Sequence, residues 1–193
     1  VTGVQTCALP ICRYVRIELP GNGKILSLAE VEVFAGGENL ARQGKATQSS
    51  TDYNGPAELA IDGNTDGVFE KKSVTHTATE ANPWWELDLQ QVRPFDRIQI
   101  WNRTDGSVGS RLAGIKILVL DADRQPVWQQ VLAEAPAKNA ELSVSGAQSV
   151  PFAQATADHS QPSFPVANAL SQKDLAASGW AVGPHMEIGR AHV

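Results

Sequence analysis

Four polar residues in the middle of the sequence have side chains that could bind a ligand together: His76, Arg103, Asp105 and Arg111. A guanidinium presents several rigid N–H donors and no acceptor, so two arginines suit the hydroxyl oxygens of an uncharged ligand such as a sugar. Three basic groups at one place would repel one another, and a carboxylate between them would neutralise and orient the arginines. We therefore expect non-covalent binding of a neutral ligand, if the fold brings these residues together.

Plainer interpretations of the same residues stay open. His76 could be a surface histidine in a threonine-rich loop, and Arg111 an ordinary solvated arginine. Arg103 and Asp105 could form only an ion pair at the end of a strand. The sequence has no Gly-x-Ser-x-Gly elbow, no His-Glu-x-x-His motif and no phosphate loop, so we do not expect catalysis within it.

The sequence around these residues predicts β-strands. Apolar and polar residues alternate with a period of two in residues 15–19, 85–89, 98–100 and 115–119, and Gly-, Asn- and Asp-rich turns separate these runs. The apolar phase shifts between Leu28 and Val31, which predicts a β-bulge near Ala29. No run has the period of a long helix. The predicted fold class is all-β, an antiparallel β-sandwich, with Trp84, Trp85 and Trp101 mainly in its core.

Several short blocks carry a family resemblance. In chain order they are Asn39-Leu40-Ala41, GKATQSS at residues 44–50, AIDGN at residues 60–64, Thr75-His76-Thr77, Asn82-Pro83-Trp84-Trp85, Asp88-Leu89 and Asn102-Arg103-Thr104-Asp105. They resemble an F-type lectin (fucolectin) module of the discoidin, or coagulation-factor C-type, galactose-binding-like superfamily. In that family a histidine, 26 residues, Arg-x-Asp and a second basic residue form the sugar motif, and 26 residues separate His76 from Arg103 here.

The resemblance implies a jelly-roll, galactose-binding-domain-like sandwich that binds fucose or a related sugar without catalysis. His76, Arg103 and Arg111 would then donate to or accept from the sugar's ring oxygen and its 3- and 4-hydroxyls, with Asp105 orienting the arginines. Phe69 would contact the methyl group of fucose. Five residues separate Asp105 from Arg111 where the family usually has four, and the family's vicinal cysteine pair is replaced by glycine and serine. This departure bears on fucose specificity more than on sugar binding.

The resemblance also implies a structural Ca²⁺ beneath the sugar site. Asp62 and Ser73 would supply side-chain oxygens, and Leu59 and Asn64 would supply carbonyl oxygens, in keeping with the hard oxygen ligands that Ca²⁺ prefers. The last ligand would be Glu30, in the block LSLAEVEV at residues 26–33, which normally closes the family's domain. Here the block comes first, so either it ends a preceding, truncated module or the module is circularly permuted. We favour permutation because residues 13–34 otherwise lack a partner. Asp62-Gly63-Asn64 could also be a simple turn.

The composition limits the partners. The chain has 193 residues, 42% of them apolar, and a net charge of −5. This mildly acidic balance argues against nucleic acid, and no apolar stretch approaches the about 20 residues of a membrane span, so we expect no membrane insertion. The expected partners are glycans, fucosylated ones above all, and other domains of a larger chain that is extracellular, periplasmic or on the cell surface. The alternative is a discoidin-like adhesion or scaffold module that binds no sugar.

The two ends of the sequence differ from the rest. Val1–Ile11 and Glu187–Val193 match translated sequencing adapters, so residues 1–12 and 187–193 are predicted not to belong to the natural domain. Residues 13–146 would form the lectin-like sandwich, with 13–35 as permuted closing strands and 133–146 as last loops and linker. A weak internal repeat predicts the truncated start of a second β module in residues 147–186. Similar modules are often appended to large secreted bacterial proteins, including planctomycete proteins with cytochrome-c-like domains.

Overall fold

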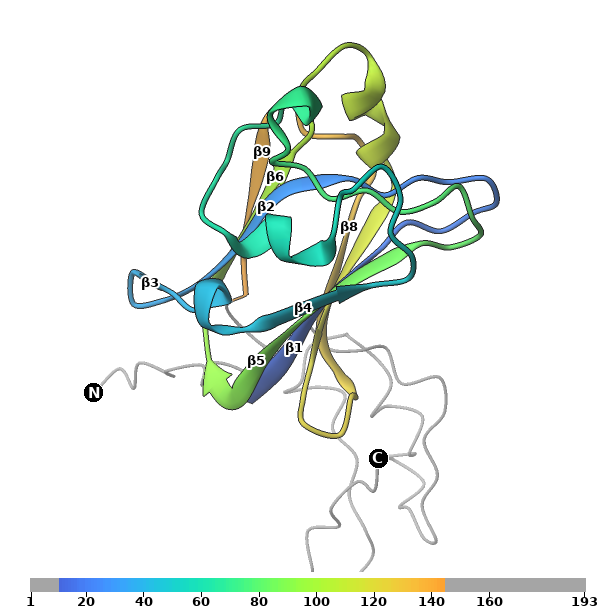
Figure 1. The fold of residues 1–193 in the computed structure, drawn as a ribbon. Coiled ribbons are helices and arrows are strands. Elements are labelled where there is room, and N and C mark those ends of the chain that lie inside the picture. The colour runs from blue at the N-terminus through green and yellow to red at the C-terminus, as the bar shows by residue number, and fades with distance from the viewer. Residues whose placement is uncertain (1–10, 145–193) are drawn as a thin grey trace, which may run out of the picture. The chain divides into compact units, whose positions relative to one another are not determined.

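The computed structural model describes residues 11–144, which fold into two antiparallel β-sheets packed as a sandwich (Figure 1). The five-stranded sheet contains, in spatial order, β4 (Lys45–Gln48), β5 (Trp84–Pro94), β1 (Ile11–Glu18), β7 (Ile115–Leu120) and β8 (Pro126–Leu132). The four-stranded sheet contains β3 (Glu38–Asn39), β2 (Leu28–Ala35), β6 (Arg97–Asn102) and β9 (Asn139–Ser143).

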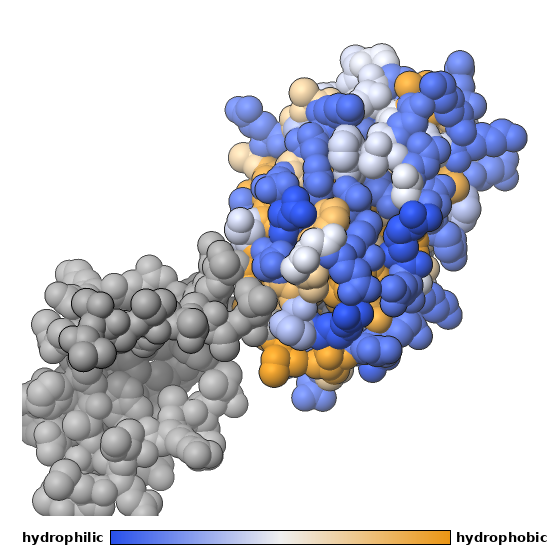
Figure 2. Space-filling view, turned by 90° about the vertical axis from the view of Figure 1, so that its left-hand side faces the viewer, coloured by the Kyte–Doolittle hydropathy of each residue, from blue (hydrophilic) through white to orange (hydrophobic). Residues whose placement is uncertain are grey.

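The helical elements within the described residues are four short 3-10 turns: η1 (Ala41–Gln43), η2 (Ala57–Ile61), η3 (Phe69–Lys71) and η4 (Val108–Leu112). The prediction of an all-β sandwich is therefore confirmed. None of the helical turns in residues 11–144 is long and apolar enough to cross a membrane. Seen from the side of β3, the surface of the domain is mostly hydrophilic, with small apolar areas between the polar side chains (Figure 2).

The core lies between the two sheets and follows the two-residue period of the sequence. On β1, Val15 and Ile17 are fully buried and pair with Leu87 and Trp85 of β5. The Trp85 indole N–H donates to the Ala57 carbonyl at 3.0 Å, which ties η2 to the five-stranded sheet. Of the three tryptophans expected mainly in the core, only Trp85 is buried there. Trp84 and Trp101 are partly exposed and lie under the cations of Arg16 and Lys138 on the outer faces of the sheets.

The predicted bulge in β2 is confirmed. The register of β2 against β6 shifts between Leu28 and Glu30, at Ala29. A bulge leaves one residue unpaired and changes which side chains face inward. As a result Ala29 and Glu30 are both fully buried, and the Glu30 carboxylate points away from solvent.

The N-terminal segment completes this sandwich. β1 is the central strand of the five-stranded sheet, and β2 pairs with both β3 and β6 in the other sheet. Residues of β1 and β2 are thus part of this sandwich, and the permuted order of residues 13–35 stays a prediction. β1 begins at Ile11 and includes buried Cys12, although both residues fall in the adapter-like end that is predicted not to belong to the domain. The rest of the two adapter-like ends and the predicted second module, residues 147–186, lie outside the described residues.

The prediction of loops and linker for residues 133–146 is partly wrong. Asn139–Ser143 form β9, an edge strand that pairs with β6 in the four-stranded sheet. Leu142 lies opposite Ile98 and is 4% exposed, and Val144 beyond it is fully buried. The strand was not predicted because Leu142 is its only large apolar residue. Alanines, prolines and serines surround it, so the sequence shows no clear alternation of apolar and polar residues.

Candidate functional site

The loop that follows β6 holds an arginine and a carboxylate in a forked pair. Arg103 Nε donates to Asp105 Oδ1 at 2.8 Å, and Arg103 Nη2 donates to Asp105 Oδ2 at 2.6 Å. The backbone N–H of Phe69 also donates to Asp105 Oδ1, at 3.1 Å. The hydrogen bonds from Arg103 are the main reason that the pKa of Asp105 falls to about 2. Asp105 is therefore ionised at all ordinary pH values and fixes the plane of the Arg103 guanidinium.

The segment before η3 brings Phe69 beneath that guanidinium. Thr104 N donates to the Gly67 carbonyl at 2.8 Å, and a Cβ on Gly67 would lie 2.5 Å from the Asn102 carbonyl oxygen, so only glycine allows this close approach. Arg103 Cζ lies 4.4 Å from the centre of the Phe69 ring. This cation–π contact holds the arginine from below while Asp105 holds it from the side.

His76 is buried, with 4% of its surface exposed, and its backbone N–H donates to the Gly55 carbonyl at 2.8 Å. Its Nδ1 lies 2.8 Å from the Thr77 carbonyl oxygen. A carbonyl only accepts, so Nδ1 carries the proton and Nε2 of the neutral ring is an acceptor. Burial lowers the pKa of His76, and the positive charges of Arg103 and Arg111 lower it further. The ring is therefore neutral at pH 7.

Arg111 lies in η4, and its side chain is exposed. Its charge is close enough to His76 to depress that residue's pKa, as the charge of Arg103 also does. The five-residue loop from Gly106 to Ser110 thus still returns the second arginine to the neighbourhood of the histidine. Phe69 joins the two sides of the site, because its ring centre is 5.7 Å from that of His76. The structure brings His76, Phe69, Arg103 and Asp105 together by direct contacts, and it places Arg111 in η4 within electrostatic reach of His76.

Tyr53 belongs to the same region and was missed by the sequence analysis. Its ring centre lies 4.9 Å from that of His76 and 6.3 Å from that of Phe69, and the residue is 66% exposed. The backbone of Tyr53 is left-handed, with φ of 50°, which is uncommon for a residue with a side chain and is often found at functional sites. Tyr53 lies among turn-forming residues and is part of no motif, so its place in the site could not be predicted from the sequence.

The predicted metal ligands lie around a loop that touches Glu30. Glu30 Oε1 accepts from the Gly63 backbone N–H at 3.0 Å, while Glu30 Oε2 is buried and has no hydrogen-bond partner. Burial is the main cause that raises the pKa of Glu30 to about 8. A buried carboxylate oxygen without a donor is costly, and a cation would satisfy it. One of the two Glu30 oxygens thus lacks the partner that a cation would provide.

The other predicted ligands are spread from η2 to the segment just after η3. Asp62 Oδ1 accepts from Asn64 N at 2.7 Å, which makes the expected turn. The Ser73 hydroxyl is buried and donates to the Asp66 carbonyl, so its lone pairs remain for another partner. Within residues 11–144, no group of three or more His, Cys, Asp or Glu side chains could hold a metal ion. A calcium site here would thus need the Ser73 hydroxyl and the carbonyls of Leu59 and Asn64 beside the two carboxylates.

The geometry of the sugar-site residues suits a small neutral ligand. Arg103 and Arg111 offer N–H donors, and His76 Nε2 offers an acceptor, so one ligand hydroxyl could donate to the imidazole while it accepts from a guanidinium. The rings of Phe69 and Tyr53 offer apolar edges. The model of the family described as NedA-like, galactose-binding domain matches residues 59–159, slightly more than half of the chain. The chain belongs to this galactose-binding domain family.

Relatives of this galactose-binding domain are lectins. Fucolectin of Anguilla anguilla is 45% identical over 85 residues, which are 42% of this chain and 53% of the relative. Fucolectin-1 of Anguilla japonica is 42% identical over 87 residues, 42% of this chain and 48% of the relative. The chain therefore spans about half the length of these curated relatives.

Solved structures give the same fold. The Streptococcus pneumoniae fucose binding module SpX-3 is 37% identical, with a TM-score of 0.54 over 56% of this chain and 79% of that one. The lectin domain of lectinolysin, complexed with Lewis B antigen, is 37% identical, with a TM-score of 0.51 over 55% of this chain and 76% of that one. These relatives are lectins and binding modules rather than enzymes, which agrees with the prediction of a non-catalytic domain.

Proposed function

We propose that residues 11–144 form a carbohydrate-binding module for fucose or a closely related sugar at the ends of extracellular glycans. The observation that carries this proposal is the Arg103–Asp105 fork over the Phe69 ring, which in turn packs against the ring of neutral His76. The names of the relatives support the sugar class, because the similar Streptococcus pneumoniae module is a fucose binding module. Localisation outside the cytoplasm and attachment to further domains are parts of the same proposal.

Each site residue has a defined task in this function. Arg103 and Arg111 donate to ring and hydroxyl oxygens of the sugar, and His76 Nε2 accepts from a hydroxyl. Asp105 does not touch the sugar but holds Arg103 in place and balances its charge. Phe69 and Tyr53 provide apolar contact, which suits the methyl group of a 6-deoxy sugar. Charged hydrogen bonds of about 1.5–3 kcal/mol each, less the cost of ordering, correspond to an affinity between micromolar and millimolar.

The test is titration calorimetry with L-fucose on the wild type, Arg103→Ala and Arg97→Ala. Arg97 is a matched control, because it also lies over an aromatic ring and pairs with a carboxylate but sits at the start of β6, on the outer face of the sheet. We expect Arg103→Ala to weaken binding at least about 100-fold and Arg97→Ala to leave it within about twofold. Equal affinities in all three proteins would refute the proposal. Retention of cell-envelope material that free fucose does not displace would favour the scaffold alternative.

We also propose that Ca²⁺ stabilises the loops beneath the sugar site. Glu30, Asp62, Ser73 and the carbonyls of Leu59 and Asn64 would hold the ion, which would supply the positive charge that the Glu30 carboxylate lacks. The support is the unpartnered oxygen Glu30 Oε2, buried on β2 against the loop at Gly63. The ion would tie β2 to this loop and so brace the segment that carries Phe69.

Thermal unfolding with Ca²⁺ and with a chelator tests this second part. We expect Ca²⁺ to raise the Tm of the wild type by several degrees and to have no effect on Glu30→Gln. Glu32→Gln is the matched control, because Glu32 is on the same strand but its Oε2 already accepts from the Trp101 indole N–H at 2.8 Å. Glu32→Gln should keep the full calcium response. A wild-type Tm that is the same with chelator and with millimolar Ca²⁺ would rule out the ion.

A further inference from the structure

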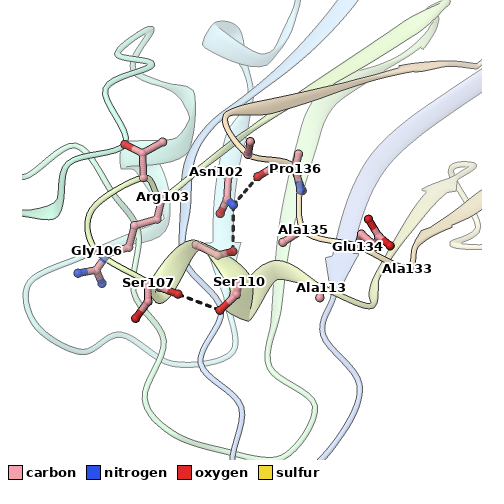
Figure 3. A pocket seen from close by; sticks show the side chains of 13 residues that line it. Asn102, Arg103, Gly106, Ser107, Ser110, Ala113, Ala133, Glu134, Ala135 and Pro136 are labelled. Atoms are coloured by element: carbon pink, nitrogen blue, oxygen red, sulfur yellow. Dashed lines mark hydrogen bonds between the residues drawn. The ribbon is translucent and has the colours of Figure 1, made fainter.

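A cavity of about 470 Å³ lies next to the sugar site and shares Arg103 with it. One wall is η4 with the loop before it, and the other is the segment 133–137, which connects β8 to β9. Figure 3 shows Arg103 at one end of the lining residues and Glu134 at the other, with Ser107 and Ser110 between them. The volume falls within the about 300–1,000 Å³ of ordinary small-molecule sites.

One buried side chain holds both walls of this cavity. Asn102 is 3% exposed, and its Nδ2 donates to the Gly109 carbonyl at 3.0 Å and to the Pro136 carbonyl at 2.8 Å. Gly109 is packed so closely that a Cβ there would lie 2.7 Å from the Arg103 carbonyl oxygen. The distance between the two walls, and their position relative to Arg103, are therefore set by the fold before any ligand binds.

The lining favours a neutral ligand with hydroxyl groups. Its side chains are mostly small: the alanines 113, 133, 135 and 137 offer methyl groups, and Thr104, Ser107 and Ser110 offer hydroxyls. Arg103 and Glu134 carry opposite charges, so neither a strongly anionic nor a strongly cationic ligand is matched. Methyl groups suit the C–H face of a pyranose ring, while hydroxyls and a carboxylate suit its hydroxyl groups.

We propose that this cavity is a second subsite, which holds the saccharide unit linked to the one bound by His76, Arg103 and Arg111. This inference rests on the proposed function, because the first saccharide must sit at Arg103 for the next to reach the cavity. Glu134 accepts hydrogen bonds from hydroxyls of the second unit, and η4 contacts both units. The module thus recognises at least two linked saccharide units at the end of a glycan.

Titration calorimetry with L-fucose and with the Lewis b antigen tests the subsite. We expect the wild type to bind the antigen about tenfold more tightly than the monosaccharide. Ala133→Trp should fill the cavity from an exposed position and abolish this difference, while its affinity for L-fucose stays within about twofold of wild type. Ala122→Trp, in the exposed turn between β7 and β8 at the other end of the sandwich, is the matched control and should retain the difference.

Glu134→Gln provides a second variant that does not change the shape of the cavity. It should weaken binding of the antigen about threefold and leave L-fucose binding unchanged. The subsite is wrong if Ala133→Trp and Glu134→Gln both keep the full advantage of the antigen, or if the wild type shows no such advantage while it binds L-fucose. Absence of L-fucose binding by the folded wild type would instead overturn the proposed function, and this inference with it.

Discussion

Two arginines, one at the start of β6 and one just beyond its end, are placed in nearly the same way, and only one belongs to the candidate site. Arg97 at the start of the strand lies 4.1 Å from the centre of the Phe34 ring and pairs with Glu141 at 2.8 Å. Arg103 just beyond the end of the strand lies 4.4 Å from the centre of the Phe69 ring and pairs with Asp105 at 2.6 Å. An arginine over an aromatic ring beside a carboxylate is thus not enough to make a site.

The surroundings of the two arginines differ. The Arg103 side chain is 12% exposed and that of Arg97 33%, so the charge of Arg103 is screened less by water. Asp105 grips Arg103 with two bonds, whereas Glu141 accepts a single bond from Arg97. Arg103 also has His76 and Arg111 near it, while Arg97 faces solvent from the sheet. The candidate site thus differs from the Arg97 pair in that its arginine is less exposed and lies near other polar site residues.

The sharpest test of this difference removes the carboxylate at each place. Asp105→Ala frees Arg103 and deprives the Phe69 N–H of its acceptor, so we expect L-fucose affinity to fall about 100-fold. Glu141→Ala breaks an exposed pair and should change affinity less than about twofold and stability by less than about 1 kcal/mol. Calorimetry and thermal unfolding measure the two effects. Similar losses of affinity in both variants would show that the two arginine–carboxylate pairs do not differ in function.

Acid should weaken sugar binding through His76. Its folded pKa is lowered by burial, so the ring stays neutral at pH 7 and becomes protonated only at a pH below its ordinary value of about 6.5. Protonation turns Nε2 from an acceptor into a donor beside two arginines, so affinity should be constant from pH 8 to about 6.5. Below the folded pKa it should fall about tenfold per pH unit.

His76 should also make the folded domain less stable as the pH falls, just as it should weaken sugar binding. A histidine whose folded pKa is depressed binds fewer protons in the folded state, so its contribution is present above about pH 6.5 and is lost as the pH falls. Asp105, with a pKa of about 2, stays ionised throughout this range and cannot cause the effect. Calorimetry between pH 8 and 5 measures the affinity, and His76→Gln should remove its steep fall. A steep fall retained in that variant would exclude His76 as the cause.

The sequence predicted the strands with large apolar residues and the polar part of the site. Val15 and Ile17 alternate with polar residues, and the apolar phase shifts at Ala29. Both patterns indicate which residues face the core, and burial of one face fixes the register of the strands. β9 escaped prediction because Leu142 is its one large buried residue. The spacing of His76 and Arg103 was readable because it came with a family motif.

Tyr53 and the cavity at Glu134 could not be read in the same way. The position of Tyr53 depends on a turn closed by Gly55, whose carbonyl accepts from His76 N, and on a left-handed backbone, which residue types indicate poorly. The cavity depends on the Asn102 amide, which joins segments 7 and 34 residues away in the chain. Such contacts between distant segments leave no periodic pattern in the sequence.

The aromatic partners of the two arginines should also differ, though less. Phe69→Ala removes both the platform beneath Arg103 and the apolar contact for a sugar methyl group, but Asp105 still holds the arginine. We therefore expect L-fucose affinity to fall about fivefold. Phe34→Ala should leave affinity within about twofold, although both variants lose a partly buried ring and about 1 kcal/mol or more of stability. An affinity loss in Phe34→Ala as large as that in Phe69→Ala would remove the contrast between the two rings.

The smallest expected effect concerns Tyr53, which has no counterpart beside Arg97. Its exposed ring covers His76 and borders Phe69, so Tyr53→Ala should weaken L-fucose binding about threefold by removing apolar contact and by letting water reach the imidazole. Tyr53→Phe keeps the ring and should bind within about twofold of wild type. Calorimetry at pH 7.5 measures both variants. If Tyr53→Ala binds L-fucose as well as wild type, the ring only shields His76 and makes no contact with the sugar. If Tyr53→Ala and Tyr53→Phe lose affinity equally, the ligand contacts the Tyr53 hydroxyl rather than the ring.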